Sequence, residues 1–198
     1  SRLVHFTLSQ QFGLRIVPAN ISSGYPTLSD VESRRDLLRR TGASSIVAVG
    51  SGAAMDLAKA LASSGNHNPQ KHHDMEHLIL LPSTYSAFIA SGSSHSLLLD
   101  QVEETLLPYP PNENTSNTNA TVTVAPLERK DTATMDSSHH ALYAVTAVVL
   151  DTCLRKIDNP QLDSMIDSLQ MLYGLSEEDL HGQLAQDTLL DLCFRAGT

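Results

Sequence analysis

The sequence predicts an α/β N-terminal part with a Rossmann-like parallel sheet, followed by an all-α C-terminal part. Two short, continuous apolar runs, at 45–50 and 77–82, have the pattern of strands buried on both faces. Segments with a helical pattern precede and separate these runs, and this alternation is typical of a parallel sheet. From about residue 131 onward, the apolar residues recur at helical spacing.

The first two elements are a short strand and a helix. We expect the apolar residues of 14–18 to form the strand. Residues 26–42 have a helical pattern, with acidic residues at the start and basic residues near the end, an order that suits the helix dipole. Ser29 or Asp30 can cap this helix, and Gly42 can end it.

The strand at 45–50 leads into small residues and then into a second helix, which we expect to end at Gly65. The strand at 77–82 follows. Residues 108–123 are rich in Pro and Asn and show no helical period, so we expect a long loop or an irregular hairpin. The boundary between the two parts should lie near 125–131.

Three helices are expected in the second part, at 140–156, 158–174 and 176–197. Pro160 suits the first turn of the second helix, because that position needs no N–H donor. Ser176 can cap the third helix, and acidic residues follow it.

Composition excludes several classes of protein. The net charge is -9 and no Lys/Arg block is present, which argues against nucleic-acid binding. No apolar run is long enough to span a membrane, and we expect a cytoplasmic protein.

Cys153 and Cys193 lie on apolar helical patterns, so we interpret them as reduced thiols in the core.

A turn of small residues joins the strand at 45–50 to the next helix. Gly50, Ser51 and Gly52 would let a ligand approach the backbone, and the helix N-terminus would offer N–H groups to a phosphate. A tight turn without a ligand explains these residues equally well. Asp56 could merely favour the helix dipole, and Lys59 could be a solvated surface charge.

Four segments, in order, resemble the iron-containing (group III) alcohol dehydrogenases. GASSIVAVGSGAAMDLAKALA (42–62) is similar to the family's apolar strand followed by GGGSxxDxAKxxA. Pro26-Thr27 matches the family's PT, and LPSTYSA (81–87) is similar to its PTT segment, in the form found in maleylacetate reductases. TATMDSSHHALYAV (132–145) is similar to TxxTGMDALTHAIEA.

The resemblance implies a nucleotide-binding α/β domain, here 1–130, and a helical metal-binding domain, here 131–198, both incomplete. It implies that the protein uses NAD or NADP as a cofactor and a divalent metal, iron or zinc. The implied substrate is a small alcohol, aldehyde or keto-acid. The cofactor-binding residues that match the family motifs are Gly50, Ser51, Gly52, Asp56, Ser83 and Thr84. Asp136 and His140 match its first two metal ligands, and carboxylate with imidazole suits a divalent first-row ion.

The chain also departs from the family pattern. Ser51 replaces the middle Gly of the turn, Ala53 replaces the Ser, and the family's two later His ligands have no match. The chain therefore looks like the middle of a longer protein. Two alternatives stay open: a non-catalytic binding protein that keeps the fold, and a dehydroquinate synthase-like enzyme. We also expect exposed apolar surface on the last helices, and hence either homo-oligomers or marginal folding.

Overall fold

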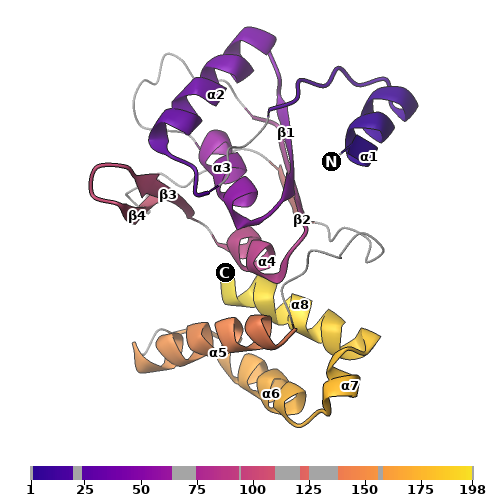
Figure 1. Ribbon diagram of the computed structural model, residues 1–198, viewed down its shortest axis with the longest axis vertical. Coiled ribbons are helices and arrows are strands. Elements are labelled where there is room, and N and C mark those ends of the chain that lie inside the picture. The colour runs from indigo at the N-terminus through magenta and orange to yellow at the C-terminus, as the bar shows by residue number, and fades with distance from the viewer. Residues whose placement is uncertain are drawn as a thin grey trace.

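The computed structural model describes residues 2–19, 24–63, 75–93, 95–109, 121–124, 138–155 and 158–197. Figure 1 shows two parts: a sheet with helices α2 and α3 beside it, and helices α5 to α8 gathered at one end of that unit. Helix α4 lies where the two parts meet. The predicted fold class, a parallel α/β part followed by a helical part, is confirmed.

Three parallel strands form the main sheet. They are β1 (Ser45–Gly50), β2 (His77–Pro82) and β5 (Thr121–Val124), in the order β1-β2-β5. The first two confirm the predicted strands. Their burial is lower than we expected: in β1 only Ala48 is fully buried, and in β2 buried residues alternate with more exposed ones. One face of the sheet therefore carries most of the core contacts.

Helix α2 (Leu28–Thr41) begins before both of the predicted caps, Ser29 and Asp30. Thr27 is the N-cap, and its hydroxyl accepts a hydrogen bond from the Asp30 N–H at 3.1 Å. The Asp30 carboxylate in turn accepts from the Thr27 N–H, which completes a capping box. Ser29 is thus not the cap, and Asp30 supports the cap from the third helical position. Gly42, with φ of 65°, ends the helix as predicted.

The predicted strand at 14–18 is wrong. Those residues have an irregular backbone, and no strand pairs with them in the part of the chain that the structure describes. A short α1 (Arg2–Phe6) and a π-helical turn η1 (Thr7–Gln11) precede them. Leu14 is 53% exposed, so this apolar segment does not enter the core.

The structure contains an antiparallel hairpin that we did not predict from the sequence. It consists of β3 (Ser96–Asp100) and β4 (Thr105–Tyr109), and it projects from the α/β part beside α3 (Figure 1). Leu99 of β3, which pairs with β4, also forms an isolated parallel bridge with Thr27. The Pro- and Asn-rich segment 108–123, for which we expected a long loop or an irregular hairpin, contains the end of β4 and most of β5.

Two helices of the first part each follow a strand of the main sheet. Helix α3 (Gly52–Ala62) follows β1 after one residue, and Ser63 is its C-cap. The expected end at Gly65 is therefore wrong. Helix α4 (Tyr85–Gly92) follows β2 after two residues and was not predicted.

The second part has four helices in the described residues: α5 (Ser138–Leu154), α6 (Leu162–Tyr173), α7 (Glu177–Leu180) and α8 (Gln183–Gly197). The predicted third helix is split by a turn at His181 and Gly182. Ser176 caps α7 as predicted, through a bond from the Asp179 N–H. Pro160 lies in a turn before α6 rather than in its first turn.

The largest apolar cluster joins α4 to the helical part. Its fully buried members include Tyr85, Val145, Leu172, Leu189 and Leu192, from α4, α5, α6 and α8. Cys193 is also buried in this cluster, which confirms the interpretation of that thiol. Cys153 is exposed at the end of α5, so its assignment to the core is wrong.

Helices α4 and α8 cross through two glycines. A Cβ on Gly92 would overlap the Phe194 carbonyl oxygen, and one on Gly197 would overlap the Ile89 carbonyl oxygen. Real Cβ atoms do not approach backbone atoms so closely, so both positions require glycine in this arrangement. The backbones of the two parts are therefore in direct contact.

Helix α5 has apolar residues on more than its core side. Tyr143, Ala147, Leu150 and Leu154 recur at helical spacing on its outer surface, and we call them the α5 stripe. Tyr143, Leu150 and Leu154 are 61%, 56% and 81% exposed. We predicted exposed apolar surface on the last helices; Met171 of α6 and Leu184 of α8 are exposed, and the α5 stripe adds to them. No helix within the described residues is long and apolar enough to cross a membrane.

The capping box predicts a specific dependence of stability on pH. Burial raises the pKa of Asp30, but hydrogen bonds from Thr27 and the charge of Arg34 outweigh it, and the net pKa is lowered. The ionised carboxylate therefore stabilises the fold above pH of about 4, and this contribution is lost as the pH falls through the lowered pKa. Asp30→Asn should cost about 0.3–1 kcal/mol at pH 7 and less at pH 3, measured by urea unfolding.

The exposed Glu32 of the same helix offers a matched control, Glu32→Gln. This variant should leave the free energy of unfolding within about 0.5 kcal/mol of the parent at pH 7. An Asp30→Asn effect of equal size at both pH values would contradict the capping box as its cause.

Candidate functional site

The carboxyl ends of β1 and β2 lie side by side at one edge of the sheet. Gly50 is paired in register with Pro82, and the Ser83 N–H donates to the Gly50 carbonyl at 2.9 Å. The turn at Gly50–Gly52 and the segment Ser83–Thr84 are therefore neighbours, as the family resemblance implies. In open α/β sheets, this edge is where ligands bind.

The turn after β1 leaves backbone donors available. Gly50 has φ of 142°, a region that favours glycine, and the chain then enters α3 through Ser51. Ser51 is the N-cap of α3, yet its exposed side chain makes no capping hydrogen bond. The N–H groups of Gly52 and Ala53, in the first turn, have no partner within the helix. These amides and a hydroxyl suit an anionic group.

The segment after β2 builds the second side of the site. The Thr84 hydroxyl caps α4 by accepting from the Ala87 N–H at 3.2 Å, and it lies 3.0 Å from the Ser86 hydroxyl. Because both strands run the same way and each is followed by a helix, α3 and α4 begin at the same edge. Two positive helix ends therefore converge there.

Asp56 and Lys59 are buried rather than solvated. Their exposed fractions are 5% and 8%, and the Lys59 Nζ lies 3.3 Å from the Asp56 Oδ1. The Lys59 ammonium also donates to the carbonyls of Ala90, Ser93 and His95. The Asp56 carboxylate accepts from the Leu97 N–H. The interpretation of Lys59 as a surface charge is wrong, and Asp56 holds the start of β3.

Burial sets the protonation behaviour of this pair. It raises the pKa of the Asp56 carboxyl, against the opposing effects of Lys59 and the Leu97 N–H. It lowers the pKa of the Lys59 ammonium, against the charge of Asp56. Each ion is thus destabilised by loss of water, and its partners offset that loss.

A sequence signal for this burial exists. Apart from Asp56 and Lys59, the helix GAAMDLAKALA consists of small or apolar residues, so it has no polar face to present to water. A helix that is apolar all round is usually buried, and its two charges must then pair.

The predicted metal ligands are only partly described. Asp136 lies outside the described residues, and His140 is exposed in the first turn of α5. Within the described ranges, no three His, Cys, Asp or Glu side chains gather as a metal site would require. His77 begins β2, at the opposite end of the strand from the site. The metal site therefore remains a prediction from the resemblance.

Tyr85, which suggested the maleylacetate reductase form of the PTT segment, is 2% exposed and packs in the largest apolar cluster. Its position accounts for an aromatic residue without reference to a substrate. The tyrosine therefore carries no information about what the protein acts on.

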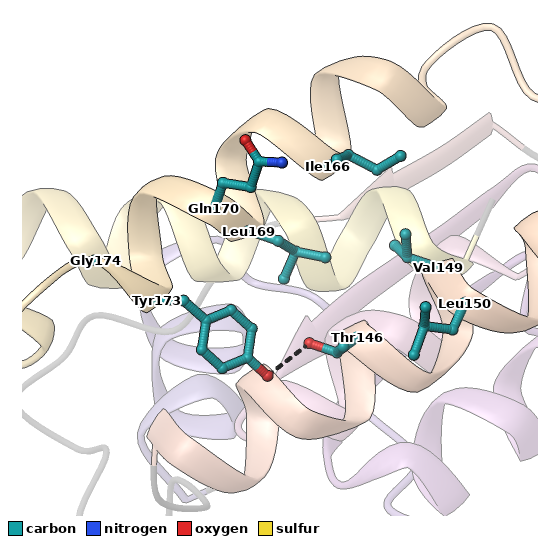
Figure 2. Close-up of a pocket in the computed structure, with 8 residues that line it drawn as sticks. All are labelled: Thr146, Val149, Leu150, Ile166, Leu169, Gln170, Tyr173 and Gly174. Carbon is teal, nitrogen blue, oxygen red and sulfur yellow. Dashed lines mark hydrogen bonds between the residues drawn. The ribbon is translucent and has the colours of Figure 1, made fainter.

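A separate pocket lies between α5 and α6. It has a volume of about 450 Å³ and is mostly apolar. Figure 2 shows the Tyr173 hydroxyl directed at the Thr146 hydroxyl, 3.0 Å away, at one side of it. None of the predicted site residues lines this pocket, whose lining is Thr146, Val149, Leu150, Ile166, Leu169, Gln170, Tyr173 and Gly174.

Comparison with known proteins agrees with this geometry. Residues 7–99 match the family described as iron-containing alcohol dehydrogenase. No curated protein matches the chain.

Solved structures share the fold. An archaeal halo-thermophilic alcohol dehydrogenase from a Red Sea brine pool has a TM-score of 0.71 at 17% identity, over 99% of this chain and 53% of that one. Sulfoacetaldehyde reductase from Bifidobacterium kashiwanohense, in complex with NAD+, has a TM-score of 0.64 at 20% identity, over 99% and 56%. An iron-containing alcohol dehydrogenase from Thermotoga maritima has a TM-score of 0.59 at 18% identity, over 87% and 49%. The chain thus spans about half the length of these proteins.

The backbone of Gly50 can be tested against its neighbour Gly52. Gly50→Ala should destabilise the fold by about 1–3 kcal/mol, because a side chain at this φ is strained. Gly52→Ala should be tolerated, since its Cβ would meet the Ala90 Cβ at an ordinary 3.5 Å. Chemical denaturation of both variants measures the difference, and equal losses would show that the φ of Gly50 is not the cause.

Proposed function

We propose that the protein is an oxidoreductase of the iron-containing alcohol dehydrogenase family, which uses NAD or NADP on a small alcohol or carbonyl substrate. The observation that carries this proposal is the convergence of the Gly50–Gly52 turn and the Ser83–Thr84 segment at one sheet edge. The family match over residues 7–99 supports it. The chain spans about half the length of the solved structures that it matches, and we propose the activity for the whole protein.

The site suits the pyrophosphate of a dinucleotide. The amides of Gly52 and Ala53 would bind phosphate oxygens, and the Ser51 hydroxyl is available to donate because no capping bond uses it. Ser83 and Thr84 would border the cofactor on the β2 side. Asp56 matches the cofactor-binding Asp of the family motif, and it lies buried on the helix that follows the turn.

The bound nicotinamide would supply hydride exchange at the substrate carbon. The residues of this chain bind the cofactor and fix its orientation at the sheet edge. Asp136 and His140 are proposed as two metal ligands because they match the family motif. Residues 1–130 would form the nucleotide-binding domain and residues 131–198 the helical metal-binding domain, in a cytoplasmic protein.

A non-catalytic binding protein is the second candidate. It is favoured by Ser51 and Ala53, where the family pattern has Gly and Ser, because both lie in the phosphate-binding turn. The two candidates differ in turnover. NAD(P)H oxidation with maleylacetate or short aldehydes, with iron or zinc added, would support the enzyme, whereas nucleotide binding without turnover of any substrate would support the binding protein.

Ser51→Asp provides a sharp test of nucleotide binding. Asp is a good N-cap, so α3 should be as stable as before or more so. The added charge would face the pyrophosphate, and we expect at least a tenfold loss of affinity for NAD or NADP in calorimetric titration, equivalent to about 1.4 kcal/mol.

The matched control is Ser29→Asp, which adds the same charge to an exposed residue in the first turn of α2. Its affinity should stay within about twofold of the parent. Failure of the parent chain to bind either nucleotide at millimolar concentration would refute the proposed site.

The α5 stripe leads us to propose homo-oligomers. Tyr143→Glu combined with Leu154→Glu should abolish concentration-dependent association in sedimentation velocity, because charged residues oppose burial of the stripe. Leu184→Glu is the control, since Leu184 is 77% exposed on α8 and lies outside the stripe. A parent chain that stays monomeric at high concentration would contradict the proposal.

A further inference from the structure

We infer that Lys59 is a positioning residue that keeps the two sides of the candidate site together, a role that rests on the proposed function of that site. Lys59 does not reach the turn at Gly50–Gly52. It acts from the far end of the same helix, through α4 and β3.

Lys59 fixes the C-terminal end of α4. Its ammonium donates to the carbonyls of Ala90 and Ser93, and the second of these bonds is 3.1 Å long. Carbonyls at the last turn of a helix have no partner within that helix, and a cation is favoured at this negative end of the dipole. A side chain of α3 thus serves as the cap of α4.

The same ammonium also fixes the chain that leaves α4. It donates to the His95 carbonyl, just before β3 begins at Ser96. Asp56, its ion-pair partner, accepts from the Leu97 N–H one residue into that strand. The pair therefore binds both ends of the connection between α4 and β3.

The opposite ends of the two helices form the site. At the start of α3, Gly52 packs across α4. A Cβ on Gly52 would lie 3.7 Å from the carbonyl oxygen of Ser86, in the first turn of α4, and 3.5 Å from the Cβ of Ala90, the residue whose carbonyl Lys59 binds. At the start of α4, the Ser83 N–H bonds to the Gly50 carbonyl. Since α4 is only eight residues long, anchoring its C-terminal end also sets the direction of its N-terminal end.

The hydrogen bond from Ser83 to Gly50 reports directly on this role. Lys59→Met keeps the length of the side chain and removes its charge and donors. We expect the Ser83 amide to exchange with solvent at least tenfold faster in this variant, when both proteins are compared at equal global stability by NMR hydrogen exchange.

Arg35→Met is the matched control. Arg35 is another cation that donates to carbonyls of a helix end, here Ala60 at 2.8 Å and Ser63 at 3.0 Å, at the C-terminal end of α3. Its loss should lower the global stability and leave the exchange of the Ser83 amide unchanged once that stability is taken into account. If both variants change Ser83 exchange equally, Lys59 is structural only and the inference is overturned.

A second variant separates positioning from the cost of an unpaired buried carboxylate. Asp56→Asn with Lys59→Met removes both charges, so it should fold even if Lys59→Met alone does not. Ser83 exchange should stay raised in this double variant, because α4 still lacks its cap. Exchange at the parent rate would overturn the inference.

Nucleotide titration distinguishes this inference from the proposed function. A parent chain that binds no nucleotide defeats the proposed function, while the exchange of Ser83 still decides whether Lys59 positions the two segments. If the parent binds, Lys59→Met should weaken binding at least tenfold and Arg35→Met should not. An equal loss in both variants would count against positioning.

Discussion

The parallel pairing of β1 with β2 is the constraint on which the rest of the structure depends. Gly50 lies opposite Pro82, so both strands end at the same level and each turns directly into a helix. That arrangement gives two helix N-termini at one edge, which is the origin of the electrostatic character of the site. The antiparallel alternative would send one of the helices to the other end of the sheet, and the polar backbone groups would not converge.

The second constraint is that a very short helix joins the two parts. Helix α4 contacts the candidate site at one end and crosses α8 near the other. The buried charges of α3 hold it on one side, and the large apolar cluster holds it on the other. The site is thus supported by residues from both parts of the chain.

Local sequence patterns predicted much of the fold, because β1, β2, α2, α5 and α6 each carry their own periodicity or cap. Errors arose where partners distant in sequence decide the outcome. The apolar segment at 14–18 has the composition of a strand, but no strand lies beside it in the described residues. Strand β5 follows a polar, Asn-rich sequence, yet it pairs with β2. Within the site, motif order placed Gly50 and Ser83 near one another. The apolar composition of α3 signals that Lys59 is buried, but no local pattern reveals that its partners are the carbonyls of Ala90 and Ser93.

The glycine crossing has a practical consequence for anyone who handles this protein. Gly197 leaves no room for a side chain beside the carbonyl of Ile89, in the helix that begins at the candidate site, so the last turn of α8 is part of the contact between the two parts. Bulky substitutions or insertions in this turn would disturb a junction that reaches the candidate site through a single helix, α4. The hairpin tip near Val102, which is 87% exposed, is a safer place for a label.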